Sequence, residues 1–167
     1  MGNDAAGQVS LRLGRRLLVH HRDGTWGLRL SAAERELLGS LAEQLAGLLG
    51  QEPDNPTLHR LFPPAYPDDV ANEAEWQVFR AAELRSSREA HLAVLRSLSS
   101  QTALNDDQVQ AWMQAINALR LVVGTQLDIT DDDQQLVVAS DDPRLPVFQL
   151  YEFLSYLLDA TITALSR

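Results

Sequence analysis

Residues Asn105 to Leu127 read NDDQVQAWMQAINALRLVVGTQL, the most informative run in this chain of 167 residues. Asn105 and Gln108 form a capping-box pair, and two aspartates follow Asn105 in the first turn, where the helix dipole favours anions. A helix that is apolar around most of its circumference is buried by its neighbours. This run therefore predicts a buried central helix, with the apolar positions Val109, Trp112, Met113, Ile116, Leu119, Leu121, Val123 and Leu127.

Further helices are predicted on both sides of this run. Ser31 and Glu34 form a second capping box, which opens a leucine-rich helix that Gly50 and Pro53 end. A short helix begins at Pro56, and a final helix begins near Pro146. Together these patterns predict a mainly α fold, a bundle of about four to five helices.

A long helical stretch runs from the cap at Asp68 or Asp69 to about Ser100. It is apolar at its two ends and polar in the middle, around Ser86 and Ser87. We expect one continuous helix with an exposed middle; a break near the serines is the alternative.

The amino-terminal region has the alternation of β-strands. Apolar residues recur at every second position between Val9 and Leu30, and Asp23-Gly24 interrupts the pattern. An Asp-Gly pair between alternating runs predicts a hairpin with a type I′ turn, in which both central residues have positive φ. We expect a small antiparallel hairpin or a three-stranded meander in residues 9–30.

Composition places the chain among soluble, folded proteins. Its apolar fraction is 45% and its charged fraction 22%, and at 167 residues it fits one domain. We expect residues 1–167 to form a single domain, with 1–8 disordered, 9–30 a β hairpin region and 31–165 a helical bundle. There is no secretory signal or membrane span in the pattern, so a cytoplasmic location is expected.

Charge is distributed unevenly along the chain. Residues 1–30 hold five arginines against two aspartates, a net +3, whereas the rest holds nine arginines against 21 acids, a net −12. A basic hairpin could follow a phosphate backbone, although the acidic body disfavours nucleic acid. The candidate nucleic-acid contacts are Arg12, Arg15, Arg16, Arg22 and Arg29; the alternative is that they are solvated or paired with the acidic body.

The segment from Leu61 to Asp69, LFPPAYPDD, cannot be regular structure because its three prolines fix φ and remove donors. A stiff backbone that presents aromatic side chains is a surface that protein partners use. Phe62, Pro63, Pro64 and Tyr66 are therefore the candidate protein-interaction surface. The alternative is a strap that packs these aromatic rings onto the bundle.

Motifs for catalysis or for a cofactor are not found in the sequence. The chain has no cysteine, which excludes disulfides, thiolate metal sites and thiol nucleophiles. None of the four histidines has the spacing of a helical metal site, and Asp131-Asp132-Asp133 lacks the glycine and alternation of a calcium loop. We expect no enzyme activity, no metal and no cofactor. The segment 134–140 could form an irregular strand.

Several of these residues also carry a family likeness. The proline segment 61–69, the run from Trp112 to Thr125 and the tail from Asp141 into Tyr151 resemble an actinobacterial family of acidic, mainly helical proteins with no assigned function. The resemblance covers about residues 30–165. It implies an actinobacterial host and a gene often encoded beside the adaptor of the Clp protease, and some members carry the label of transcriptional regulator. It implies no catalytic or binding residue.

These observations favour a non-catalytic interaction or regulatory protein, linked through the resemblance to regulated proteolysis. We expect a protein partner, with a homodimer left open. The alternative is a DNA-binding transcriptional regulator that uses the basic hairpin.

Overall fold

The computed structural model describes residues 16–52, 55–98, 100–130 and 138–167. Within these ranges the helices are α1 (Ala32–Gln51), the short 3-10 helix η1 (Pro56–Leu61), α2 (Val70–Ser97), α3 (Asp106–Gln126) and α4 (Leu145–Leu165). A small antiparallel sheet accompanies them. The prediction of a mainly α bundle with a small β element is confirmed.

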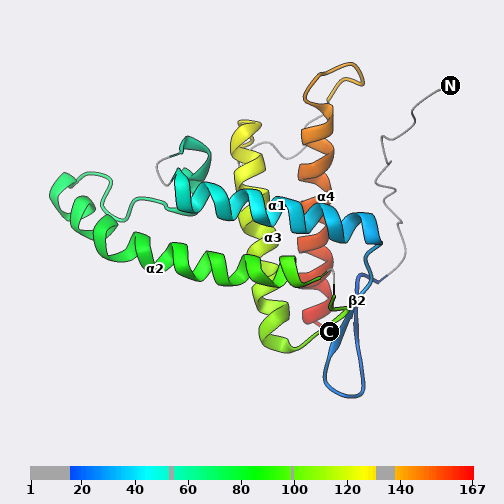
Figure 1. Ribbon diagram of the computed structural model, residues 1–167. Coiled ribbons are helices and arrows are strands. Elements are labelled where there is room, and N and C mark those ends of the chain that lie inside the picture. Colours follow the sequence, from blue (N-terminus) through cyan, green and yellow to red (C-terminus); the bar gives the residue numbers. More distant parts are fainter. Residues whose placement is uncertain (1–15, 53–54, 99, 131–137) are drawn as a thin grey trace.

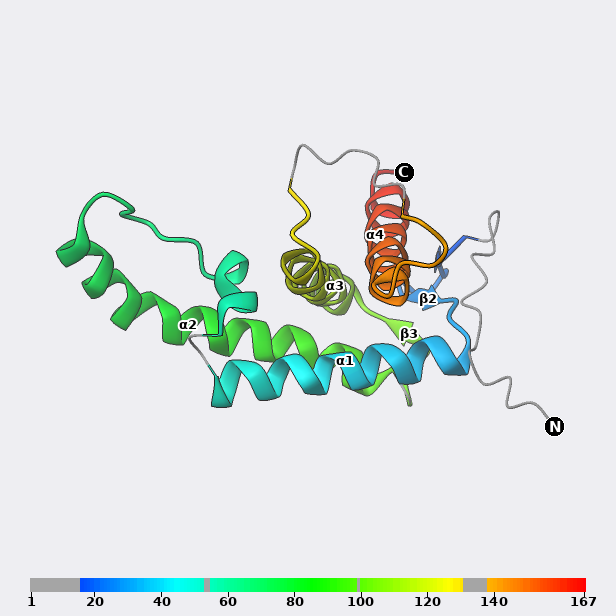
Figure 2. The ribbon, with the colours of Figure 1, turned by 90° about the horizontal axis from the view of Figure 1, so that it is seen from above.

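The α-helices form two layers that cross at a steep angle (Figure 1). α1 and α2 run antiparallel in one layer, and α3 and α4 run antiparallel in the other, which the view from above also shows (Figure 2). α3 packs against α1, α2, α4 and η1. Trp112 and Ile116 of α3 have no exposed surface, so the prediction of a buried central helix is confirmed.

Both capping boxes that the sequence predicts are present. The Glu34 amide donates to Ser31 Oγ over 3.2 Å, and the Ser31 amide donates to Glu34 Oε2 over 2.6 Å. At α3, the Gln108 amide donates to Asn105 Oδ1 over 2.8 Å, and the Asn105 amide donates to Gln108 Oε1 over 2.9 Å. These bonds satisfy amides that have no partner inside the helix, which is why both helices begin where they do.

The sheet has three strands in the order β1 (Leu18–His20), β2 (Trp26–Leu28) and β3 (Ala103–Leu104). β1 and β2 pair antiparallel, so the predicted hairpin is confirmed. The third strand comes from the connection between α2 and α3. The outer strand that the sequence suggests near Val9 lies outside the described residues.

The prediction of a type I′ turn at Asp23-Gly24 is wrong. Gly24 has φ of 83°, but Asp23 is not among the described residues with positive φ. The turn instead has hydrogen bonds from the Gly24 amide to the His21 carbonyl and from the His21 amide to the Thr25 carbonyl. This is the pattern of a longer hairpin loop with one left-handed glycine. The Asp23 carboxylate accepts from the amide and the hydroxyl of Thr25, which stabilises that loop.

Arg35 joins the sheet to the layer formed by α1 and α2. Its guanidinium donates to the carbonyls of Leu28 at the end of β2, of Leu98 after α2 and of Gln101, over 2.6, 3.1 and 3.0 Å. Its Nε also donates to the Leu30 carbonyl over 3.4 Å. These carbonyls lie at element ends, where the backbone has no regular partner. Arg35 therefore fixes the sheet against the start of α1 and the end of α2.

α2 is one continuous helix of 28 residues, as expected, but its burial differs from the expectation. Leu92 and Leu95 in its second half are fully buried, whereas Val78 and Phe79 near its start are exposed. α1 has 20 residues, so at 1.5 Å per residue α2 is about 12 Å longer than the helix beside it. The first half of α2 therefore extends beyond the bundle (Figures 1 and 2).

The middle of α2 is largely exposed, as predicted, with Ser86 and Ser87 on the surface. Arg85 and Arg88 are half-buried there, under Phe62. The possible strand in residues 134–140 falls mostly on residues 131–137, outside the described ranges. Val138, the first residue after them, packs against the core.

Candidate protein-interaction surface

The proline segment has one packed aromatic residue and one exposed aromatic residue. Phe62 follows η1 and packs against the core. Its ring also lies 5.9 Å from the Arg85 guanidinium carbon and 5.7 Å from that of Arg88. Pro63 and Pro64 are exposed, and Tyr66 has 47% of its surface exposed. Phe62 therefore packs onto the bundle, as the strap alternative expects. Tyr66 is exposed and available to a partner.

Glu73 in the first turn of α2 holds the loop around Tyr66. Its Oε2 atom accepts from the amides of Ala65 and Tyr66 over 2.9 and 2.8 Å, and its Oε1 accepts from Gln77 over 2.6 Å. These bonds favour the charged carboxylate, so the Tyr66 amide bond, followed by the Gln77 bond, lowers the pKa of Glu73. The backbone that presents Tyr66 is thus fixed to the start of α2.

The sequence did not single out the most exposed apolar residues. Val70 is 87% exposed, Val78 73% and Phe79 72%, and all three lie on the part of α2 that extends beyond the bundle. We call Tyr66, Val70, Val78 and Phe79 the α2 arm. The positions of Val78 and Phe79 suggested a packed helix end, because periodicity alone does not reveal whether a neighbouring helix covers that end.

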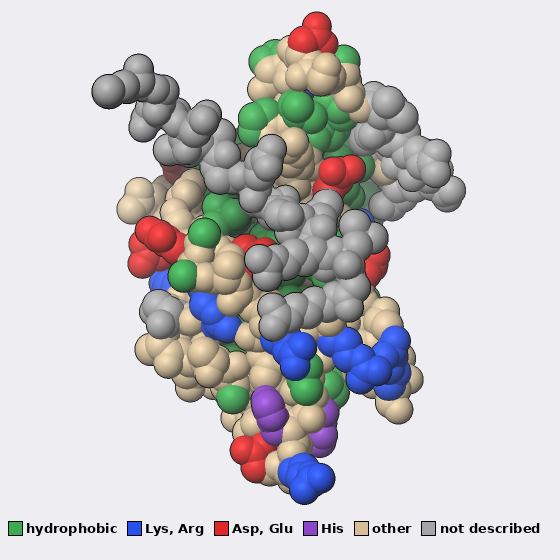
Figure 3. All heavy atoms as spheres, turned by 90° about the vertical axis from the view of Figure 1, so that its right-hand side faces the viewer, with side chains coloured by type: hydrophobic (Ala, Val, Ile, Leu, Met, Phe, Trp, Pro, Cys, Tyr) green, Lys and Arg blue, Asp and Glu red, His purple; other side chains and the backbone are tan. Residues whose placement is uncertain are grey.

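The predicted basic head, which is the arginine-rich segment of residues 1–30, is only partly described. Arg12 and Arg15 lie outside the described residues, whereas Arg16, Arg22 and Arg29 are exposed on or beside the hairpin. Basic side chains and histidines gather at the hairpin end of the molecule (Figure 3). The hairpin is held to α3 by Trp26, whose indole N–H donates to the Asp106 carboxylate over 2.8 Å.

The described part of the chain has neither a cluster of metal ligands nor a membrane-spanning helix. No group of three or more metal-ligating side chains occurs among those residues. None of the helices in the described ranges combines the length and apolarity needed to cross a membrane. The exposed apolar side chains of the α2 arm are therefore the clearest candidate for a protein-binding surface.

Comparison with known proteins places the chain in a family. Residues 15–165 match the profile of the domain of unknown function DUF2017. The chain belongs to the DUF2017 family. This agrees with the resemblance that the proline segment and the later helices suggest.

Two curated relatives of this DUF2017 chain come from Mycobacterium tuberculosis and Mycobacterium bovis, and both bear the name oxidative stress regulator AosR. Each is 28% identical over 188 residues, which cover 88% of this chain and 85% of the relative. These relatives are actinobacterial, as the resemblance implies. No solved structure matches the chain significantly.

Proposed function

We propose that this DUF2017 chain is a cytoplasmic, non-catalytic regulatory protein that acts by binding a protein partner through the α2 arm. The observation that carries the proposal is the exposure of Val78 and Phe79, at 73% and 72%, on a helix that extends past its neighbours. Apolar side chains on an ordered helix are the kind of surface that partner proteins cover. Self-association through the arm and a link to regulated proteolysis are parts of the same proposal.

The names of the mycobacterial relatives support a regulatory role. They are called oxidative stress regulators. This chain has no cysteine, so it has no thiol that could be oxidised to a sulfenic acid or a disulfide. Cysteine oxidation in this chain therefore cannot be the sensing step of an oxidative response, which is consistent with action through a partner.

The test is capture of the tagged protein from lysate of its host, with and without nuclease, followed by mass spectrometry. The variant Val78→Ser/Phe79→Ser should lose a nuclease-resistant partner while keeping its thermal midpoint, because both side chains are exposed. The matched control is Ala90→Ser/Ala93→Ser, two exposed positions in the second half of the same helix.

Retention of the same partner by the arm variant would contradict the proposal. Light scattering after size-exclusion chromatography separates self-association from binding of another protein. A dimer that the arm variant abolishes would identify a second copy as the partner. The variant Tyr66→Ala tests whether the loop contributes, and Phe62→Ala should instead destabilise the fold because Phe62 packs against the core.

A second candidate function is DNA-binding regulation through the hairpin. The observation in its favour is the exposure of Arg16, Arg22 and Arg29 beside His20 and His21, which are also exposed. A β-ribbon of this kind can enter a DNA groove. Partners that disappear after nuclease treatment in the same capture experiment would support this candidate.

A further inference from the structure

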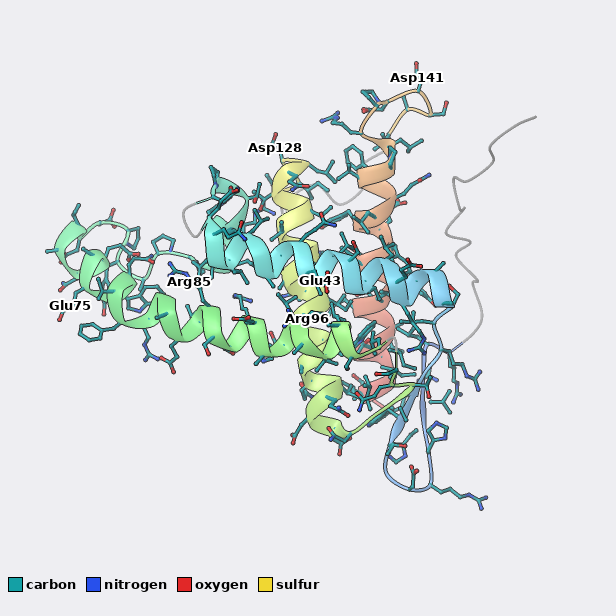
Figure 4. The ribbon with its side chains drawn as sticks, in the orientation of Figure 1. Glu43, Glu75, Arg85, Arg96, Asp128 and Asp141 are labelled. Carbon is teal, nitrogen blue, oxygen red and sulfur yellow. The ribbon has the colours of Figure 1, made fainter. Side chains whose placement is uncertain are left out.

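Arg85 and Arg88 form a basic pair at the root of the α2 arm. They are three residues apart on α2, and both guanidinium groups lie against the ring of Phe62, at 5.9 and 5.7 Å from its centroid. Figure 4 shows Arg85 on the side of α2 that faces η1 and the segment after it. Both side chains are half-buried.

The hydrogen-bonding capacity of this pair is mostly unused within the described residues. Arg88 donates one bond from Nη2 to the Leu61 carbonyl, over 2.7 Å. The Nε atoms of Arg85 and Arg88 are buried without a hydrogen-bond partner, and Arg85 makes no other hydrogen bond there. A buried donor without an acceptor is costly, and few occur in folded proteins.

Neither arginine of the pair forms an ion pair within the described ranges. The ion pairs found there are Arg80 with Glu83 and Arg144 with Asp142, so neither Arg85 nor Arg88 is paired with a carboxylate. Burial lowers the pKa of Arg88, and burial, followed by the charge of Arg88, lowers the pKa of His91 one turn later. The positive charge of Arg88 therefore acts on a neighbouring side chain, His91. The pair is a local positive site in a chain whose net charge is −9.

We propose that Arg85 and Arg88 bind a small oxyanion, a phosphate or carboxylate group, beside Phe62 on the side of α2 that faces the segment after η1. Two planar guanidinium groups on one helix face match the geometry of such an anion, which accepts paired hydrogen bonds from their Nη atoms. The Phe62 ring orients both groups by cation–π contact, so less side-chain freedom is lost on binding. The site does not depend on whether the α2 arm binds a protein.

The probes are inorganic phosphate and malonate, each compared with sodium chloride at equal ionic strength. We expect one of them to raise the thermal midpoint by about 3 °C, with saturation in roughly the millimolar range. The Nε–H signals of Arg85 and Arg88 should shift with the same midpoint in nitrogen–proton spectra. Saturation by phosphate alone would identify a phosphate source, and saturation by malonate alone a carboxylate source.

Arg85→Gln is the main variant, because Arg85 forms no hydrogen bond or ion pair in the described part of the structure, and its loss should leave the fold intact. It should abolish the saturable shift, as should Arg88→Gln. The control Arg80→Gln changes an exposed arginine of the same helix and should retain full binding. An unsaturated rise that is equal in all variants would be the general effect of excluded anions and would overturn the proposal. So would the absence of any shift.

Discussion

Thr161 on α4 is the one buried polar residue in the described core. Its hydroxyl accepts from the indole N–H of Trp112 over 2.9 Å and donates to the Leu157 carbonyl over 2.7 Å. All three residues have no exposed surface. A single hydroxyl therefore satisfies the polar atom of the largest side chain in the core and joins α3 to α4.

Thr161→Val tests this bond while keeping the shape of the side chain. The substitution leaves the Trp112 N–H buried without an acceptor, so the free energy of unfolding should fall by about 1–3 kcal/mol. Denaturant unfolding followed by tryptophan fluorescence measures it. The control is Thr163→Val, an exposed position on the same helix, which should change stability by less than about 0.5 kcal/mol. Equal effects of the two substitutions would show that the indole bond contributes nothing.

Glu73 gives a pH-dependent prediction at the level of a single residue. Its pKa is lowered in the folded protein from an ordinary value of 4.5, because the charged form accepts the Tyr66 amide bond and the Gln77 bond. A carboxylate with a lowered pKa stabilises the folded loop above its ordinary value and loses that effect as the pH falls through the folded pKa. The loop around Tyr66 should therefore loosen only in acid.

Amide exchange of Ala65 and Tyr66 measures this loosening. Their protection factors should drop between about pH 6 and about pH 3 in the parent chain, after correction for intrinsic exchange. Glu73→Gln should have lower protection at neutral pH and little pH dependence, because the neutral amide no longer titrates. If the glutamine variant kept the parent's pH profile, another acid would hold the loop.

At the scale of an element, α2 has two halves with different roles. Leu95 is fully buried between the layers, whereas Phe79 is 72% exposed. Leu95→Ala should lower the free energy of unfolding by about 2–5 kcal/mol through the lost contacts and the cavity. Phe79→Ala should change it by less than about 0.5 kcal/mol. Comparable losses in chemical denaturation would mean that the first half of α2 is part of the core.

The helix starts were predictable because their signals are local. Ser31 with Glu34 and Asn105 with Gln108 each place two side chains where the first turn needs them, and no distant residue is involved. The hairpin was predictable for the same reason, although the position of Gly24 in a longer loop was not. β3 was missed because a pair of residues, Ala103 and Leu104, carries no alternation.

The candidate site was less predictable, because exposure depends on neighbours that are distant in the sequence. Tyr66 was singled out from its place among prolines, and its exposure agrees with that choice. Val78 and Phe79 have the same local pattern as packed residues, but they are exposed on a helix that is eight residues longer than α1. Arg85 and Arg88 looked like part of a solvated face. The position of Phe62 over them depends on the path of the proline segment.

At the scale of the whole molecule, the separation of charge bears on the two candidate functions. The exposed arginines of the hairpin belong to the basic head, and the rest of the chain carries a net −12. A negative body repels the phosphate backbone at distances up to a Debye length, about 8 Å in physiological salt. The hairpin must therefore bind DNA against the field of the remainder of the chain.

This balance predicts how any DNA binding would respond to salt. The basic head has five arginines, and each can neutralise one phosphate. The slope of log affinity against log salt concentration should therefore be no steeper than about −4.5. Affinity for duplex DNA should then fall by at most about 500-fold between 50 and 200 mM salt. Fluorescence anisotropy with a labelled duplex measures the slope, with Arg22→Gln/Arg29→Gln reducing it by about 2. Tight binding that persists at high salt and survives this substitution would show contacts outside the hairpin, and the α2 arm would no longer be the leading candidate surface.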